Sequence, residues 1–217
     1  MYEVENSYES FSDRAPLIEA RGKGGSLVNA DLAFLDLRGI DLSGLDLTET
    51  VFTGSDLTGA NLEGCNISSI FAQDARMDQL RLTGATANQA FFQQTTLKGV
   101  DFSGMDLNGA SFLLCKMKGA KFDGTNLTGA KLMTCDLTDV KFHNTDLEDG
   151  VLRESDLEGA SFKSSNLRNV DFRKTILLDA VFEDVQAEGA LIYGKPPWEG
   201  DSSDTDYTKI LPTFDGE

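Results

Sequence analysis

The sequence predicts an all-β solenoid, a chain wound into stacked coils, and three observations support this fold class. Every fifth residue from Leu27 to Ile192 is apolar: these 34 positions hold eighteen Leu, nine Phe, two Ile, two Met and three Ala, with no residue skipped or inserted. Of the 21 glycines, 16 share the phase that lies two residues after the centres, where a tight turn requires a positive φ. Asp or Asn recurs immediately before the centre, as at Asp31 and Asp106. This regularity is typical of a repeat architecture.

The nine central Phe residues indicate the length of one coil. They fall on alternate units, in two sets: 52, 92, 112 and 172, and 102, 122, 142, 162 and 182. This is a sub-period of ten residues, which is compatible with a coil of twenty residues and therefore with four units in each coil.

Several strings resemble the A(D/N)LXX signature of the pentapeptide repeat family, over about three-quarters of the chain. They are Ala-Asp-Leu (30–32), Gly-Ala-Asn-Leu (59–62), Gly-Ala-Ser-Phe (109–112) and Gly-Thr-Asn-Leu-Thr-Gly (124–129). The resemblance implies a right-handed quadrilateral parallel β-helix of about eight coils, with one unit on each side. It also implies that the centre and the small residue two positions before it point inward.

The continuous phase predicts one repeat domain, residues 26–192, between two shorter segments. Residues 1–25 are expected to cap the first coil with Tyr8, Phe11, Leu17 and Ile18, because terminal repeats need covers. Residues 193–217 are expected to form a C-terminal cap, in which Trp198 covers the last coil, and an acidic tail. No apolar run approaches the ~20 residues of a membrane span, and the acidic start does not resemble a secretory signal. A cytoplasmic location is therefore the default expectation.

The repeat pattern loosens between Ile70 and Thr96. Ala72 and Ala87 replace large centres there, while the phase of the repeat survives. We expect the coil to continue with thinner packing, which could bend the axis or leave room for aromatic neighbours.

The formal net charge of −17 disfavours direct binding to nucleic acid or an anionic membrane and favours basic partners. With four units per coil, one side collects seven acids against Arg168, for a net charge of −6. We call it the acidic side, and its acids are Asp46, Glu49, Asp106, Asp146, Glu148, Asp149 and Glu188. A solvated acidic face without a partner is the alternative, because exposed carboxylates one coil apart repel by only about 1 kcal/mol in water.

The next side carries no net charge and has apolar residues at positions that should face water. We call it the apolar side, and its outward residues include Phe34, Val51, Phe71, Phe91, Leu113, Leu114, Met133 and Val151. Stacked coils should place them in one longitudinal stripe, and exposed apolar surface usually marks an interface. We expect a protein partner or a homodimer contact there. Local overpacking around Ala72 and Ala87 is the alternative.

The sequence offers no candidate catalytic, metal-binding or cofactor-binding residue. His143, the single histidine, is in an outward position, where we expect a surface imidazole with no nucleophile or metal ligand beside it. Cys65, Cys115 and Cys135 occupy the small inward position and are expected to be buried free thiols. A bridge between Cys115 and Cys135, one coil apart, is geometrically conceivable.

Two functions remain open. The chain resembles the quinolone-resistance members of the family, which implies a non-enzymatic DNA mimic that occupies the DNA-binding saddle of DNA gyrase or topoisomerase IV. In that case the acidic side, with Asp46, Asp106 and Asp146 at its core, would contact basic residues of the enzyme. The alternative is a structural or adaptor module, for example in a secretion apparatus, that docks a protein partner on the apolar side.

Overall fold

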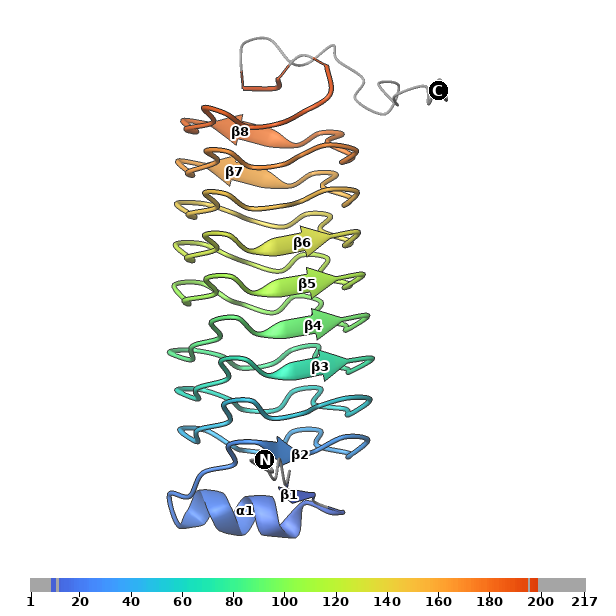
Figure 1. Cartoon of the computed structure of the whole chain (residues 1–217), viewed down its shortest axis with the longest axis vertical. Helices are drawn as coiled ribbons and strands as arrows, with labels where there is room; N and C mark the ends of the chain where they lie inside the picture. The colour runs from blue at the N-terminus through green and yellow to red at the C-terminus, as the bar shows by residue number, and fades with distance from the viewer. Residues whose placement is uncertain (1–8, 11, 195, 199–217) are drawn as a thin grey trace, which may run out of the picture.

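Residues twenty apart in the sequence lie directly over one another. The computed structural model describes residues 9–10, 12–194 and 196–198, and its parallel bridges pair Ser26 with Asp46 and so on to the pair Asn166 with Gln186. Separate rows of bridges begin at residues 26, 31, 36 and 41, five residues apart. Each coil therefore has four sides, and the chain is the expected parallel β-solenoid (Figure 1).

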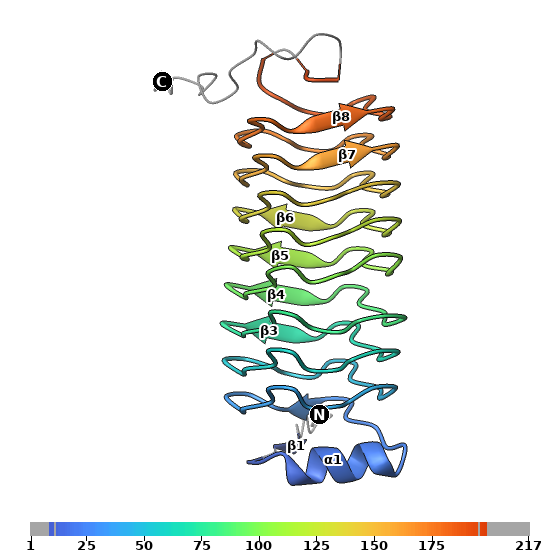
Figure 2. The same ribbon diagram turned by 180° about the vertical axis from the view of Figure 1, so that it is seen from behind.

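The extended segments are short. The elements are β1 (Glu9–Ser10), α1 (Ala15–Gly22), β2 (Ala30–Asp31), β3 (Phe71–Gln73), β4 (Phe91–Gln93), β5 (Ser111–Leu113), β6 (Lys131–Met133), β7 (Ser161–Lys163) and β8 (Val181–Glu183). β3 to β6 form one parallel sheet, and β7 and β8 form another. The two sheets lie on opposite sides of the solenoid, so the arrows of β3 to β6 run opposite to those of β7 and β8 in Figures 1 and 2. Six coils carry a three-residue strand, so counting strands gives about six turns where the length predicts about eight.

The core consists of the repeat centres, and the two predicted Phe sets form two columns inside it. The ring of Phe122 is stacked 4.9 Å from Phe102 and 5.2 Å from Phe142, with interplanar angles of 6° and 9°. Phe112, in the other column, meets Phe122 edge to face at 6.5 Å. Offset stacks and edge-to-face pairs are the arrangements that aromatic rings prefer. The predicted coil of twenty residues is thereby confirmed.

Small polar residues at the corners bond successive coils together. The Ser155 hydroxyl donates to the Leu132 carbonyl at 2.7 Å and accepts the Cys135 N–H at 3.0 Å. Cys65, Cys115 and Cys135 are buried free thiols, and the hydrogen bond between Cys115 and Cys135, together with burial, raises the pKa of Cys135. The cysteines are therefore corner residues of the core, and no bridge joins them.

The N-terminal segment contains a helix that the sequence pattern of the repeats does not show. The Ala15 N–H donates to Asp13 Oδ1 at 2.9 Å, which caps α1 in the usual way. Leu17 is fully buried against the first coil, whereas Ile18 is 55% exposed. Of the four expected cap residues, Leu17 therefore covers the core and Ile18 does not; Tyr8 and Phe11 lie outside the described residues.

At the other end, the Trp198 ring lies 5.4 Å from Phe182 and 5.8 Å from Phe172. Its indole therefore rests on the last Phe of each column, where the sequence places a cap. The acidic tail beyond it lies outside the described residues.

Candidate functional site

The acidic side is divided by amides. In the row of residues that precede the centres, Asn126 lies between Asp106 and Asp146, and its Nδ2 donates to Asp106 Oδ1 at 2.9 Å. Asn166, in the next coil, donates to Asp146 Oδ1 at 2.9 Å. Asp46 lies further down the same row, separated from Asp106 by Asn66 and Thr86. The three predicted Asp residues of this row, Asp46, Asp106 and Asp146, share one side but are separated by other residues.

Two groups of carboxylates remain on this side. Asp46 and Glu49 form one group in the same coil, and Asp146, Glu148 and Asp149 form the other. Most of these carboxylates already accept hydrogen bonds. Asp46 Oδ1 accepts the Thr48 N–H, Glu148 accepts from Asn166, and Asp149 accepts from Asn169. Elsewhere on this side, Arg168 pairs with Glu188 at 3.4 Å.

The Asp positions also have a local role in the turns. The Oδ1 of Asp46 accepts the Thr48 N–H at 3.0 Å, and that of Asp146 accepts the Glu148 N–H at 3.1 Å. Side chains of Asp and Asn that bond the N–H two residues on are a common turn device. The recurrence of Asp before the centres therefore has a structural explanation, and recognition of a partner by these acids is a further hypothesis.

The apolar side begins with a row of three stacked residues. Val51, Phe71 and Phe91 pair successively along one row of the coils, and the rings of Phe71 and Phe91 are parallel at 5.0 Å. Phe71 is 38% exposed. Phe34 is 78% exposed, and its ring lies against Gly54 in the coil above, where an added Cβ would meet it at 2.6 Å.

The remaining apolar residues lie in neighbouring rows. Leu113 pairs with Met133 on the other flank of the centres, and Leu114 is 43% exposed at the adjoining corner. The row of Phe91 continues with Ser111 and Lys131 before it reaches Val151. The apolar side therefore carries two adjoining patches, and Lys131 separates Val151 from both.

The opposite side contains the one interruption of the backbone ladder between Leu27 and Leu191 in the described chain. Elsewhere backbone N–H groups bond carbonyls of the neighbouring coil at three positions of each unit: the centre, the residue before it and the second residue after it. Four N–H groups lack that bond, and all four lie between the same two coils; they belong to Gln79, Leu82, Gly84 and Asp101. At the end of the interruption, Asp106 still forms a bridge with Thr86. We call this interruption the open step. The loosened repeat between Ile70 and Thr96 predicts thinner packing here but no break.

The coils on either side of the open step are paired normally. The Leu62 N–H donates to the Arg81 carbonyl at 2.8 Å, and the Phe102 N–H donates to the Lys121 carbonyl at 2.8 Å. In Figures 1 and 2 the coils are spread apart along one edge of the stack at the level of β4 and evenly spaced along the other. The solenoid therefore opens on one side and stays closed on the side of β3 and β4.

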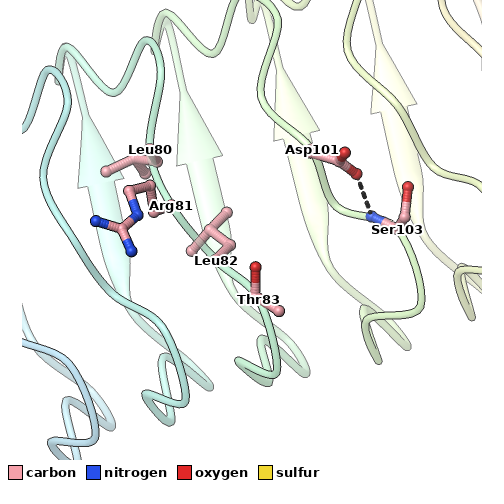
Figure 3. Close-up of a pocket in the computed structure, with 6 residues that line it drawn as sticks. All are labelled: Leu80, Arg81, Leu82, Thr83, Asp101 and Ser103. Carbon is pink, nitrogen blue, oxygen red and sulfur yellow. Dashed lines mark hydrogen bonds between the residues drawn. The ribbon is translucent and has the colours of Figure 1, made fainter.

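A cavity of about 340 Å³ lies at the open step. Figure 3 shows its lining from two successive coils, and the residues are Leu80, Arg81, Leu82, Thr83, Asp101 and Ser103. At its rim, Asp101 Oδ1 accepts the Ser103 N–H at 3.0 Å. Burial alone would raise the pKa of Asp101, but the hydrogen bonds from Ser103 and the charge of Lys121 lower it.

A change of core volume accompanies the opening. The lower coil has Ala72 and Ala87 among its centres, and the upper coil has Phe92 and Phe102. Phe102 is the first Phe of its column and lies above Leu82, so its ring has no ring below to stack on. Leu80, buried at 6% exposure, occupies the inward position that small residues usually fill.

His143 has partners that sequence analysis missed. Its Nε2 lies 2.9 Å from Ser161 Oγ, and its Nδ1 lies 3.4 Å from Asp123 Oδ1. The expectation that no nucleophile lies beside it is wrong, because residues 18 and 20 apart become neighbours in a twenty-residue coil. An acyl-transfer site requires N–H donors that stabilise an oxyanion. The Ser161 N–H already donates to the Val140 carbonyl, so it cannot take that role. We assign these contacts to the coil surface.

Among the described residues, no group of three or more His, Cys, Asp or Glu side chains could hold a metal ion. Within the part of the chain that the structure describes, the one helix is too short to cross a membrane.

The fold and the surfaces define a class of protein: a repeat solenoid without an evident catalytic centre in its described part, which offers long flat sides to other molecules. Comparison with family models identifies the particular family. The model described as "Pentapeptide repeat region" matches residues 45–122, and the model "Pentapeptide repeats (8 copies)" matches 115–153, 141–177 and 155–191. The chain belongs to the pentapeptide repeat family. A search of curated proteins finds no match.

Solved structures of similar fold include HetL, a pentapeptide repeat protein involved in heterocyst differentiation regulation in Nostoc sp. strain PCC 7120. It is 23% identical, with 78% of this chain and 79% of HetL covered and a TM-score of 0.31. A thylakoid-lumen protein of Arabidopsis thaliana is 31% identical over 46% of this chain and 66% of its own, with a TM-score of 0.35. Full-length QnrB1, a plasmid-mediated fluoroquinolone resistance protein, is 16% identical over 85% and 89%, with a TM-score of 0.35.

Proposed function

We propose that this protein is a non-enzymatic scaffold that binds a protein partner through the apolar side. The observation that carries this proposal is the row Val51, Phe71 and Phe91, which places two stacked aromatic rings at the surface. Aromatic residues dominate the energetic centres of protein interfaces. The second patch, with Leu113 and Met133, extends the contact along the solenoid.

The surroundings of these patches favour a protein as the partner. Gln73 and Gln93 pair beside the Phe rings, and Lys131 follows on the same side. An apolar centre with a polar rim is the usual composition of a protein interface. The same patches could join two copies of the chain, which gives a homodimer as one form of the proposal.

The test replaces the exposed ring of Phe71 and the half-buried ring of Phe91 with the double substitution Phe71→Ser and Phe91→Ser. Both side chains point outward, so we expect folding to persist while binding falls by at least tenfold. The matched control is the pair Ile176→Ser and Leu178→Ser, which removes two apolar side chains, 40% and 42% exposed, from a different side.

Capture of partners by chemical cross-linking in cell extract, identified by mass spectrometry, measures the effect. Sizing of the purified protein tests the homodimer. Equal capture and equal size for the Phe71/Phe91 variant and the wild type, with the circular dichroism unchanged, would contradict the proposal.

A second candidate function is supported by the group of Asp146, Glu148 and Asp149 on the acidic side. In this candidate the protein acts in the cytoplasm as a mimic of DNA that binds DNA gyrase or topoisomerase IV and protects it from quinolones. The three carboxylates lie in one coil turn of an otherwise amide-rich side, where they can meet a basic surface.

A supercoiling assay separates the two functions. Purified protein should inhibit gyrase or reduce quinolone-induced cleavage, and the triple variant Asp146→Asn, Glu148→Gln and Asp149→Asn should weaken that effect. The control variant neutralises three acids on another side, namely Asp136→Asn, Asp156→Asn and Glu158→Gln. No change in supercoiling or cleavage at micromolar protein would remove this candidate and leave the first one intact.

A further inference from the structure

The open step exposes two unpaired backbone edges that face each other. The lower coil presents the N–H groups of Leu82 and Gly84, whose regular acceptors are the carbonyls of Asp101 and Ser103. The upper coil presents the Asp101 N–H, whose regular acceptor is the Leu80 carbonyl. Unpaired peptide groups away from bulk water are costly, so native proteins supply partners for nearly all of them. Leu82 is buried, whereas Gly84 and Asp101 are exposed, so the open step can take a partner from solvent that both donates and accepts hydrogen bonds.

An extended peptide has this combination. In a β-strand the N–H and C=O groups of one residue face one edge, and those of the next residue face the other. A strand placed in the open step can therefore give carbonyls to Leu82 and Gly84 while it gives N–H groups to the carbonyls of Asp101 and Ser103. We propose that the open step is a binding site for an extended segment of a partner protein, held mainly through its backbone.

The dimensions and the access of the site fit this occupant. The volume of about 340 Å³ lies at the small end of the roughly 300–1,000 Å³ range of ligand sites. Arg81, Thr83, Asp101 and Ser103 are all exposed at its rim, so a chain can enter from solvent. Strand addition at a sheet edge is a general mode of peptide recognition.

The charges at the rim are already paired. Arg81 Nη2 contacts Glu63 Oε2 at 2.9 Å, and Lys121 Nζ lies 3.5 Å from Asp101 Oδ2. The rim therefore offers little net charge for selecting a peptide by its side chains. The site lies on the side opposite the apolar patches, so it is independent of the proposed function, and either can fail without the other.

Hydrogen exchange followed by NMR tests the premise. We expect the amides of Leu82, Gly84 and Asp101 to exchange at least tenfold faster than the amides of Leu62 and Gly64, which hold the same positions one coil below. Equal protection of the two sets would show that the ladder is closed in solution and would overturn the proposal.

Titration with a peptide tests the occupant. The probe is a blocked pentapeptide of alternating threonine and valine, and the matched control peptide carries N-methyl groups on its amides, which removes the donors. We expect saturable chemical-shift changes at Leu82, Gly84 and Asp101 with the probe and at least a tenfold weaker response with the N-methylated peptide. Equal responses to both peptides, or none to either, would mean that the open step holds water alone.

Two variants complete the test. Ser103→Trp places a large side chain at the rim of the open step, and Ser43→Trp places the same side chain at the equivalent outward position of a closed coil on the same side. Peptide binding should be lost in the first variant and retained in the second. Retention in both would place the peptide elsewhere and contradict the proposal.

Discussion

Two steps on the same side of the solenoid have opposite outcomes. Between Leu82 and Phe102 the backbone bonds are missing, whereas between Phe122 and Phe142 the rings stack at 5.2 Å and the Phe122 N–H reaches the Lys141 carbonyl at 2.8 Å. Both steps keep the five-residue phase. The difference shows that the repeat fixes which residues point inward but does not by itself ensure that neighbouring coils bond each other.

The largest expected effect is on stability at the closed step. Phe122→Ala removes a fully buried ring that contacts Phe102, Phe112 and Phe142, and should lower the free energy of unfolding by about 3–5 kcal/mol. Leu82→Ala at the open step should cost about 2 kcal/mol, the low end for a buried Leu. Urea unfolding followed by circular dichroism measures both. An equal or larger cost for Leu82→Ala would contradict the expected difference in packing between the closed step and the open step.

A buried carboxylate of the closed coils, Asp171, and Asp101 at the open step should differ in their dependence on pH. Burial alone would raise the pKa of Asp171, but hydrogen bonds from the side chain and backbone of Arg173 lower it. Asp171 is buried, with 8% exposure, and its Oδ2 lies 2.7 Å from Arg173 Nη2. A lowered pKa in the folded state contributes stability above the ordinary carboxyl pKa of about 4 and loses it as the pH falls.

Asp171→Asn should therefore lower the free energy of unfolding by about 1–3 kcal/mol at pH 7, and the difference from wild type should shrink as the pH falls below about 4. Asp101→Asn at the exposed rim of the open step should have a much smaller effect at either pH. Denaturant midpoints across this pH range provide the measurement. A difference at Asp171 that does not change with pH would show that its charge is not the cause.

Restoring a small inward residue should close the open step. In Leu80→Ala the lost burial is offset by the recovered backbone bonds, each worth about 1 kcal/mol, so the net cost should be below the usual 2–5 kcal/mol for a buried Leu. The amides of Leu82 and Gly84 should then exchange as slowly as those of Leu62 and Gly64. Fast exchange in the variant would show that Leu80 does not hold the coils apart.

The smallest expected effect is at a corner of the closed coils. Cys135→Ser keeps a donor for the Phe112 carbonyl, which Cys135 Sγ contacts at 3.4 Å, and should change stability by less than about 1 kcal/mol. Cys135→Ala lacks the donor and should cost about 1 kcal/mol more. Thermal unfolding of the two variants gives the comparison. A larger loss for Ser than for Ala would contradict the role of Cys135 as a corner donor.

Much of the fold follows from the sequence because the phase of the repeat is continuous. The inward positions, the two Phe columns and the buried thiols all follow from counting in fives and twenties. The helix α1 could have been found from Asp13 and Pro16, which are an N-cap and a first-turn residue, but the repeat phase does not extend there. The interface residues keep the status of predictions, since periodicity places them on a side without showing what they contact.

The open step could be located in the sequence but not recognised as a break. Ala72 and Ala87 mark thinner packing, yet only the three-dimensional stack shows that Phe92 lies above Ala72, that Phe102 lies above Leu82 and that Leu80 fills a small site. The contacts of His143 with Asp123 and Ser161 were missed for a similar reason. They depend on how one coil lies over the next, a relation that becomes visible once the register is applied to every outward position.

The register of twenty residues also limits how such a gene can change in length. Loss or gain of a single five-residue unit would turn every later residue by a quarter of the circumference. A unit gained between Phe91 and Asp146, for example, would place Asp146 and its neighbours above Phe71 and Phe91. Duplication of a whole coil would lengthen the protein and leave each face aligned. Viable length variants should therefore differ by multiples of twenty residues, and a shift by one unit would scramble both surfaces while the core remained apolar.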